Sequence, residues 1–556
     1  MVPSKSWARA AILCMGVLLI AVACTGDDGP AEGPDARATG GSGEAGETPD
    51  ALPSPDASVA AAFTDEGNVL DVAIREPNSL DPMRIQDPGS GLVARQLYEG
   101  LTRWNPETQE VEPAAATKIE TSKDARTLTI TLPKDASFHN GDPVTAQDFA
   151  FAFNRIALKR NGADIAYLLE LVEGFDEVNA FGDSNSLSGI TTPSDHTLVI
   201  KLSEPYANFP AVLSHPSLVP LPEKWFKESD NFLAEPVGNG PFELAQPFEL
   251  SAPVVLRAFE DSHQEVSLEG IRFLPFPDAA SSWIPFRNGQ LDIAEVPASR
   301  FDQASEEYGE DGLVPLLVGS YYGFNLDSKE LSDIRVRKAI NYAIDRDAIG
   351  ASVYAGTLLP PRGIVPEGMP GFTNDACERV CAYDPDEAAR LVGKLPKKSR
   401  SVTVEYTREP PQGRIAKLVR DDLESAGLDV TLKAYRFTRY LERLSDEGHS
   451  MYRLGWIAEY PDPDVFLSAL FDSGSPDNHA AFDSEQVDEL LARAQETDSE
   501  VKRVGLYRKA EMKILEQAPI APLGSFRMFW AAQPGVEGAT FDMLGGFDAA
   551  PISLAS

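Results

Sequence analysis

The chain has 556 residues, which is too many for a single hydrophobic core, so we expect about two to four domains. Hydrophobic residues make up 43% of the chain and aromatic residues 9%, as is typical of globular proteins. The formal net charge is −37, and so acidic a surface repels phosphate groups. The charge therefore excludes nucleic-acid binding through the phosphate backbone and suits a solvated surface.

Residues 1–24 predict a lipoprotein signal peptide. Lys5 and Arg9 form a basic start, and an apolar run of about 14 residues follows, which is shorter than the roughly 20 residues of a membrane span. The run ends in Ala-Val-Ala-Cys, which resembles a bacterial lipobox with a lipidated Cys24, although Ala21 stands where Leu is preferred. The alternative is an ordinary secretory signal with an incidental Cys. Acyl chains on Cys24 would hold the protein at the outer face of the membrane.

Residues 25–62 consist mostly of Gly, Pro, Ala, Asp and Glu and offer almost nothing that a core could bury. Such a composition cannot offset the conformational entropy lost on folding, so it predicts a disordered tether. The stretch at 41–46 fits the pattern GxGxxG, but no strand precedes it and no helix follows it. We therefore interpret it as a chance match.

Two Cys residues remain in the globular part, Cys377 and Cys381. In an oxidising compartment, a pair this close predicts a disulfide that closes a short loop. A metal pair is the alternative, but two Cys without a nearby His cannot complete a tetrahedral site. The sequence therefore predicts no metal site and no cofactor.

The stretch Leu454–Phe466 (LGWIAEYPDPDVF) combines a large aromatic residue, a carboxylate and a turn. Pro461 and Pro463 prevent a helix from continuing through it. Trp456 and Glu459 then have two interpretations. They are either a packed core Trp beside a solvated loop carboxylate, or an aromatic wall and a carboxylate that together receive a cationic ligand group.

Apolar periodicity predicts a mixed α/β protein. Alternation predicts strands at 69–74, 127–132, 197–202, 401–406 and 429–433. Helical spacing predicts helices at 93–101, 146–156, 414–426, 487–496 and 502–517. Thr145 and Asp148 predict a capping-box start for the second of these helices. The strand, helix and strand between 401 and 433 form a β-α-β unit, which predicts a parallel strand pair.

A further helix is expected after Ser332, which can cap it. Val336, Ile340 and Ile344 fall on one face of this helix and predict its buried side. The basic residues of the same helix predict a solvated or ion-paired face, with an anion site as the alternative; they are Arg335, Arg337 and Lys338.

Several short motifs follow one another along the chain. They lie at 79–82 (SLDP), 98–101 (YEGL), 138–148 (FHNGDPVTAQD), 237–242 (VGNGPF), 286–292 (FRNGQLD), 324–327 (FNLD), 333–339 (DIRVRKA) and 343–346 (AIDR). In this order they resemble the peptide/nickel family of extracytoplasmic solute-binding proteins, which serve ABC importers. The stretch from Gly455 to Pro463 is similar to a late pocket segment of that family. The resemblance covers roughly residues 69–523.

The resemblance implies a two-lobed α/β fold of the periplasmic-binding-protein type, built from three segments, with a ligand cleft between the lobes. Lobe I would take residues 63–108, 236–320 and 516–556, an accessory domain 109–235, and lobe II 321–515. The crossings near 317–322 and 518–523 would form the hinge on which the lobes close.

The resemblance also implies the site. In oligopeptide-binding relatives, an Asp at the position matching Glu459 pairs with the α-ammonium group of the peptide, and Glu keeps that charge on a longer side chain. The further candidate ligand residues are Gly455, Trp456, Tyr167, Tyr321 and Asn325, with a core or hinge role as the alternative for each. Ordered water in roomy side-chain pockets would permit broad specificity.

The sequence shows no GxSxG, HExxH or Walker A motif, and its six His residues lack ligand spacing. His139 and His215 are interpreted as structural or exposed rather than catalytic. We therefore expect no enzyme but a monomeric, lipid-anchored receptor that captures oligopeptides for an ABC permease. The alternatives are a nickel complex or oligosaccharide as the solute, a cell-envelope hydrolase, and a chaperone-like lipoprotein.

Overall fold

The computed structural model describes residues 68–229, 231–445 and 448–555. The predicted signal peptide, the tether and Cys24 lie outside these residues. Among the described helices, none is both long and apolar enough to cross a membrane.

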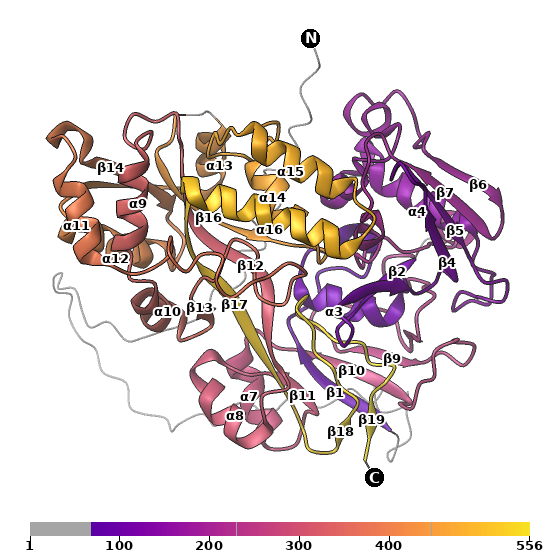
Figure 1. Cartoon of the computed structure of the whole chain (residues 1–556). Coiled ribbons are helices and arrows are strands. Elements are labelled where there is room, and N and C mark those ends of the chain that lie inside the picture. Colours follow the sequence, from indigo (N-terminus) through magenta and orange to yellow (C-terminus); the bar gives the residue numbers. More distant parts are fainter. Residues whose placement is uncertain (1–67, 230, 446–447, 556) are drawn as a thin grey trace, which may run out of the picture.

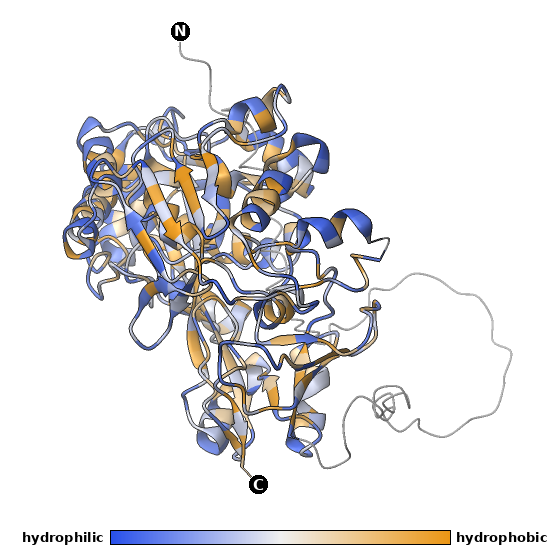
Figure 2. Cartoon of the chain, turned by 90° about the vertical axis from the view of Figure 1, so that its right-hand side faces the viewer, coloured by the Kyte–Doolittle hydropathy of each residue, from blue (hydrophilic) through white to orange (hydrophobic). Residues whose placement is uncertain are grey.

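A mixed sheet of eleven strands runs through the molecule and connects its lower and upper parts (Figure 1). Its strands, in spatial order, are β15 (Asp429–Tyr435), β14 (Ser401–Thr407), β16 (Met451–Ile457), β12 (Leu313–Phe324), β17 (Ile520–Ala532), β11 (Ile293–Glu295), β1 (Val69–Ile74), β10 (Gly270–Pro275), β9 (Val254–Ala258) and β8 (Phe242–Leu244), with β13 (Leu358–Leu359) beside β17. Apolar residues of these strands lie between helices whose outer faces are hydrophilic (Figure 2).

The lower part is built around β1, which pairs in parallel with β10 and β11. The predicted strand at 69–74 is therefore confirmed. Helices α7 (Ala279–Arg287) and α8 (Phe301–Tyr308) pack on this part with Phe529 of β17.

Helix α3 (Pro88–Leu97) begins earlier than the sequence indicates, because Asp87 caps it and Pro88 occupies its first position. Gly89 and Gly91 in the first turn have no apolar side chain, so the hydrophobic periodicity does not indicate this start. The predicted helix at 93–101 is thus wrong at its end, since Tyr98 is already extended.

The two long strands β12 and β17 carry the sheet from the lower part into the upper part (Figure 1). Their antiparallel register shifts twice, between Pro315 and Gly319 and between Ser320 and Tyr321. Opposite this irregular stretch, Gly524 has φ +150°, and a Cβ there would lie 2.0 Å from the Leu359 carbonyl oxygen. The close approach of β13 therefore requires glycine at this position.

The upper part contains the predicted β-α-β unit. Strand β14 pairs in parallel with β15, and α12 (Gln412–Ser425) connects them. Val336, Ile340 and Ile344 are fully buried at α9 (Ile334–Ala343), as predicted. Further helices of this part are α10 (Arg346–Tyr354), α11 (Pro385–Gly393), α13 (Phe437–Ser445), α14 (Asp464–Phe471), α15 (Glu485–Gln495) and α16 (Glu500–Gln517).

Two expectations for α9 are wrong. Asp333, not Ser332, caps the helix, because its carboxylate accepts the Arg335 N–H. Arg337 is buried instead of solvated: its guanidinium donates to backbone carbonyl oxygens, including those of Gln517 at 2.7 Å and Ala518 at 3.0 Å. These carbonyls at the end of α16 replace water as its partners.

Beside the large sheet lies a smaller sheet of four strands, shown in purple at the right of Figure 1. Its order is β4 (Lys118–Thr121), β5 (Thr127–Thr131), β7 (Thr197–Lys201) and β6 (Ile190–Ser194). Helix α4 (Ala146–Ala157) packs on it and begins with the predicted capping box of Thr145 and Asp148. Short elements complete the fold: β2 (Thr102–Asn105), β3 (Glu110–Pro113), α5 (Phe209–Val212), α6 (Glu223–Glu228), β18 (Val536–Glu537) and β19 (Ser553–Leu554).

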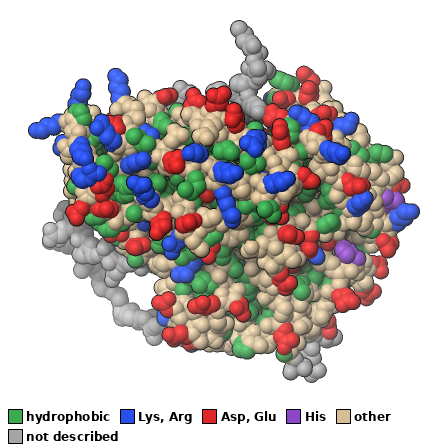
Figure 3. Space-filling view, in the orientation of Figure 1, with side chains coloured by type: hydrophobic (Ala, Val, Ile, Leu, Met, Phe, Trp, Pro, Cys, Tyr) green, Lys and Arg blue, Asp and Glu red, His purple; other side chains and the backbone are tan. Residues whose placement is uncertain are grey.

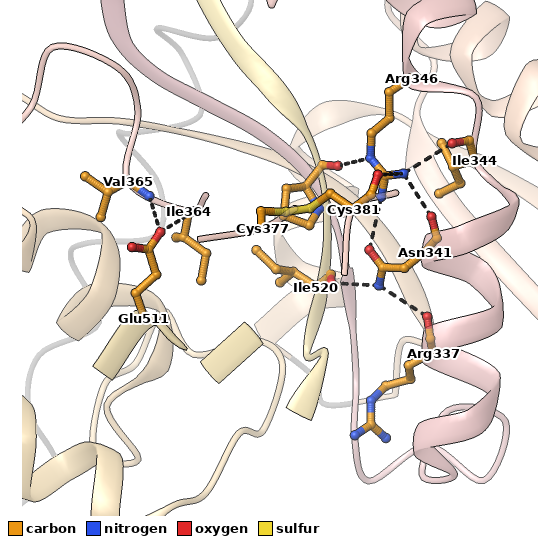
Figure 4. The surroundings of a disulfide bond; sticks show 11 residues. Arg337, Asn341, Ile344, Arg346, Ile364, Val365, Cys377, Cys381, Glu511 and Ile520 are labelled. Carbon is orange, nitrogen blue, oxygen red and sulfur yellow. Dashed lines mark hydrogen bonds between the residues drawn. A yellow bond between two sulfur atoms is a disulfide. The ribbon is translucent and has the colours of Figure 1, made fainter. Parts of the chain in front are cut away.

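Cys377 and Cys381 are joined in a disulfide, with their Cα atoms 5.4 Å apart (Figure 4). The buried Arg346 guanidinium donates to the Cys381 carbonyl oxygen and to the Asn341 side chain. Asn341 in turn donates to the Ile520 carbonyl oxygen of β17. The disulfide loop is therefore tied to the helices and to the central sheet.

Candidate functional site

Glu459 follows β16 and faces a segment that is far away in the chain. Its Oε2 atom lies 3.2 Å from Nε2 of His215, a buried residue between α5 and α6. Protein surrounds the Glu459 carboxylate, although 23% of its side chain still reaches solvent. A partly accessible carboxylate therefore lies where the upper part meets the segment that carries His215.

The backbone fixes the tautomer of His215. The Ser217 N–H donates to Nδ1 of His215 at 3.1 Å, so Nδ1 is the acceptor. The proton of the neutral ring is then on Nε2, which donates to Glu459. The sequence prediction of a structural His215 is therefore incomplete, because the side chain also contacts the candidate ligand carboxylate.

Tyr167 lies in the 3-10 helix η3 (Asp164–Leu169) and hydrogen-bonds to the Glu459 carboxylate. Burial alone would raise the pKa of Glu459. The hydrogen bonds that the carboxylate accepts from His215 and Tyr167 outweigh burial and lower this pKa. Glu459 is therefore held as the anion by two residues from the side of the smaller sheet.

The other candidates of the late segment are part of the core. Trp456 is 4% exposed, and its indole N–H donates to the Val465 carbonyl oxygen at 2.7 Å. Gly455 pairs with Ser320 across β16 and β12. The interpretation of Trp456 as a packed core residue agrees with this environment, and ligand contacts of Gly455 and Trp456 stay a prediction.

Tyr321 and Asn325 are also buried. The Tyr321 ring lies edge-to-face against Tyr452, with centroids 6.4 Å apart. The Asn325 amide donates to the His449 carbonyl oxygen at 3.0 Å, and its oxygen accepts the Asp327 N–H. These contacts shape the end of β12, and a ligand role for either residue stays a prediction.

A second contact connects the same two regions. The Asn208 amide donates to the Asp462 carboxylate, and the Ala207 N–H donates to the Gln495 carbonyl oxygen at 2.7 Å. Asp462 is fully buried, and burial, reinforced by the charge of Asp464, raises its pKa to about 6. The turn after β16 therefore presents two carboxylates to one opposing segment.

His215 also lines a pocket of about 70 Å³. The polar residues that line it include Arg95, Glu99, Trp104, His215, Gln264 and Asp548. It has room for a few water molecules or the end of one side chain, but not for a whole peptide.

Sequence reasoning found Glu459 and Tyr167 but missed Asn208, His215 and Asp548. Asn208 immediately precedes α5, His215 lies in the turn region after that helix, and Asp548 lies in a C-terminal stretch without periodicity. None of them carries a signal until the fold brings it to the site. Within the described residues, no group of three His, Cys, Asp or Glu side chains could hold a metal ion.

Comparison with known proteins identifies the family. The profile of the bacterial extracellular solute-binding proteins, family 5, matches residues 110–478, which is more than half of the chain. The chain belongs to this family. Its members are solute-binding proteins, and the predicted resemblance is confirmed.

Relatives of this family 5 protein span nearly its whole length. The oligopeptide-binding protein OppA of Bacillus subtilis is 28% identical over 486 residues, covering 83% of this chain and 88% of the relative. The dipeptide-binding protein DppE of the same organism is 28% identical over 495 residues, covering 85% and 89%.

Solved structures confirm the predicted two-lobed α/β fold of this family 5 protein. The unliganded open form of the murein tripeptide-binding protein MppA has a TM-score of 0.77 at 24% identity and covers 88% of this chain and 98% of its own. OppA of Haemophilus influenzae, in complex with the peptide RPPGFSPFR, has a TM-score of 0.66 at 23% identity and covers 88% and 100%.

Proposed function

We propose that this protein is the receptor of an ABC importer and captures oligopeptides in the cleft at Glu459. It acts as a monomer, held at the outer face of the membrane by lipidated Cys24, and delivers the closed complex to the permease. Family membership supports a receptor outside the cytoplasm, and the names of OppA and DppE support a peptide as the solute.

The observation that carries this proposal is the environment of Glu459. Its carboxylate is kept ionised by His215 and Tyr167, yet 23% of the side chain reaches solvent. A peptide α-ammonium group can therefore form an ion pair with a carboxylate that is already held in place, so little conformational entropy is lost on binding. Glu459 would thus bind the N-terminus of the peptide.

Lobe closure would complete the site. We assign lobe I to residues 63–108, 236–320 and 516–556, the accessory domain to 109–235, and lobe II to 321–515. The two register shifts of β12 against β17 support a hinge near 317–322 and 518–523, since an irregular ladder is easier to bend than a regular one.

A non-peptide solute, such as a nickel complex or an oligosaccharide, is the second candidate. A 26% identical relative in Escherichia coli is named a probable deoxycholate-binding periplasmic protein, so the family includes a solute of another chemistry. The acidic side chains spread among basic ones in Figure 3 do not favour either class of solute.

Native mass spectrometry of the purified protein, followed by denaturing analysis of what it carries, tests the proposal. We expect a mixture of masses that correspond to short peptides, and calorimetric titration with an alanine tripeptide should give saturable binding. A single non-peptide mass, or a metal, would support the second candidate. Saturable binding of deoxycholate or an oligosaccharide without peptide binding would contradict the peptide proposal.

A further inference from the structure

One of the residues that line the pocket beside His215 is an aspartate, Asp548. Asp548 lies in the C-terminal segment after β18, its side chain is exposed, and it lines the pocket. Among the described residues, none forms a hydrogen bond or ion pair with this carboxylate. Desolvation by the surrounding protein raises the pKa of Asp548. The positive charge of Arg95 lowers this pKa, and the negative charge of Asp542 raises it further. The charges of Arg95 and Arg103 act on Asp548 from a distance, but among the described residues its carboxylate has no direct ion-pair partner.

The neighbouring charges compensate one another instead. Arg95 pairs with Asp542 at 2.7 Å, where both side chains are largely buried. Arg103 pairs with Glu112 at 2.8 Å. The two cations that line the pocket are thus already neutralised by partners of their own.

The second carboxylate of the pocket, Glu99, has weaker partners. It accepts the Gln264 amide at 2.8 Å and lies 3.4 Å from Nε2 of the exposed His263. If His263 is protonated, it compensates the charge of Glu99. The pocket then still has one negative charge in excess, that of Asp548. The electrostatics of the pocket therefore favour a cation over an anion.

A second observation indicates that the pocket receives a ligand. The Trp104 indole N–H and the Arg95 Nη1 are buried and have no hydrogen-bond partner in the described part of the chain. Buried donors of this kind are rare unless a ligand or an ordered water supplies the acceptor. An amino-acid residue of a peptide offers both a carbonyl acceptor and a side chain, and the volume of about 70 Å³ fits the end of one side chain.

His215 connects this pocket to the proposed peptide site, since it lines the pocket and donates to Glu459. We propose that the pocket is a subsite for a cationic side chain of the bound peptide, a guanidinium or ammonium group, with Asp548 as its counter-charge and Glu99 as a second acceptor. The proposal rests on the proposed function, and it makes basic peptides the preferred substrates.

Calorimetric titration of the full-length protein with two series of short alanine peptides tests the subsite. In one series Arg occupies each position in turn, and in the other citrulline, its neutral isostere, does. We expect Arg to bind at least about tenfold more tightly than citrulline at one position only. In Asp548→Asn this ratio should fall below about threefold, and Asp548→Glu should restore most of it.

Asp311→Asn is the matched control, because Asp311 is exposed and does not line the pocket. It should keep the wild-type ratio. The subsite is refuted if no peptide position prefers Arg, or if Asp548→Asn keeps the preference. It is also refuted if a peptide with Glu at that position binds better than the same peptide with Gln. If the unsubstituted alanine peptides do not bind to the wild-type protein, it is the proposed function that fails.

Discussion

Glu459 contacts His215, and Asp548 lines a pocket together with His215, but the environments of the two carboxylates differ. Glu459 is surrounded by protein, accepts hydrogen bonds from His215 and Tyr167, and has a lowered pKa. Asp548 is exposed, has no partner among the described residues, and has a raised pKa. One carboxylate is thus held in place by direct partners, whereas the other gains a direct counter-charge only when a cation binds beside it.

This difference predicts different roles. A carboxylate held by the protein gives the same contact to every ligand with an α-ammonium group, so it contributes affinity without selecting side chains. A carboxylate without a direct partner increases the affinity only for ligands that carry a positive side chain, so it contributes specificity. Glu459 would therefore determine whether peptides bind, and Asp548 which peptides bind best.

The largest effect is expected from Glu459→Gln. Losing one partner of a desolvated ion pair typically costs about 3–5 kcal/mol, and solvent access to Glu459 reduces this cost. Affinity for an alanine tripeptide should fall at least about tenfold by calorimetry. The melting temperature of the ligand-free protein should stay the same, because the Gln oxygen can still accept from His215. Glu306→Gln, a change at an exposed residue, is the control, and an unchanged affinity in Glu459→Gln would remove Glu459 from the site.

His215→Leu tests whether the protein holds Glu459 as the anion. Without the His215 hydrogen bond, burial should raise the pKa of Glu459 above its wild-type value. Because binding requires the carboxylate, it is lost as the pH falls through this pKa. Titration of an alanine tripeptide from pH 4 to pH 8 should therefore show the loss about one pH unit higher in the variant.

His215→Gln retains an N–H donor and should resemble the wild type. A weaker affinity in His215→Leu that is uniform across the pH range would instead indicate a purely structural role for His215.

Sequence reasoning reached Glu459 but not the groups that hold it, and the reason is physical. Glu459 lies within one local pattern, an aromatic strand followed by a Pro-Asp turn. Its partner His215 is 244 residues earlier and contacts it only after two regions of the chain have packed together. Local periodicity predicted β1, α4 and the β-α-β unit for the same reason, since their signals lie within the elements themselves.

The misplaced features also depended on tertiary structure. The sequence predicts a solvated or ion-paired Arg337, but carbonyl oxygens at the end of α16 accept hydrogen bonds from its guanidinium and so permit its burial. The start of α3 was concealed by glycines, one of which, Gly89, allows the close approach of the Arg75 carbonyl oxygen. At such positions, contacts with a neighbouring segment determine which residue type fits, and the periodicity of the helix does not.

A third carboxylate extends the comparison. Asp462 is more completely buried than Glu459, and the donors to its carboxylate in the described part of the chain are two uncharged groups, the Asn208 amide and the Asp464 N–H. Its raised pKa of about 6 therefore lies above the value near 4 in an unfolded chain. Folding then takes up a proton between these two pH values, and the stability of the wild-type protein gains as the pH falls through about 6.

Urea unfolding of the wild type and of Asp462→Asn at pH 7.5 and pH 5 measures this gain. The wild type should gain about 1.4 kcal/mol relative to the variant at the lower pH, because pH 5 lies about one unit below the pKa of Asp462. Asp311→Asn should show no such dependence. A difference between the wild type and Asp462→Asn that is independent of pH would mean that Asp462 keeps the same pKa in the folded and unfolded states.

The smallest effect on peptide binding is expected far from these carboxylates, at the Cys377–Cys381 disulfide. Labelling of the protein without residues 1–59 should detect no free thiol until a reductant is added, and two reactive thiols at the outset would contradict the disulfide. Because the bridge closes a very short loop, replacing both Cys with Ser should cost only about 2 kcal/mol. Peptide affinity should not change, since Arg346 and Asn341 still tie this loop to β17. A loss of affinity would instead connect the loop to the proposed hinge near 518–523, because the same two side chains tie the loop to β17, which contains part of that stretch.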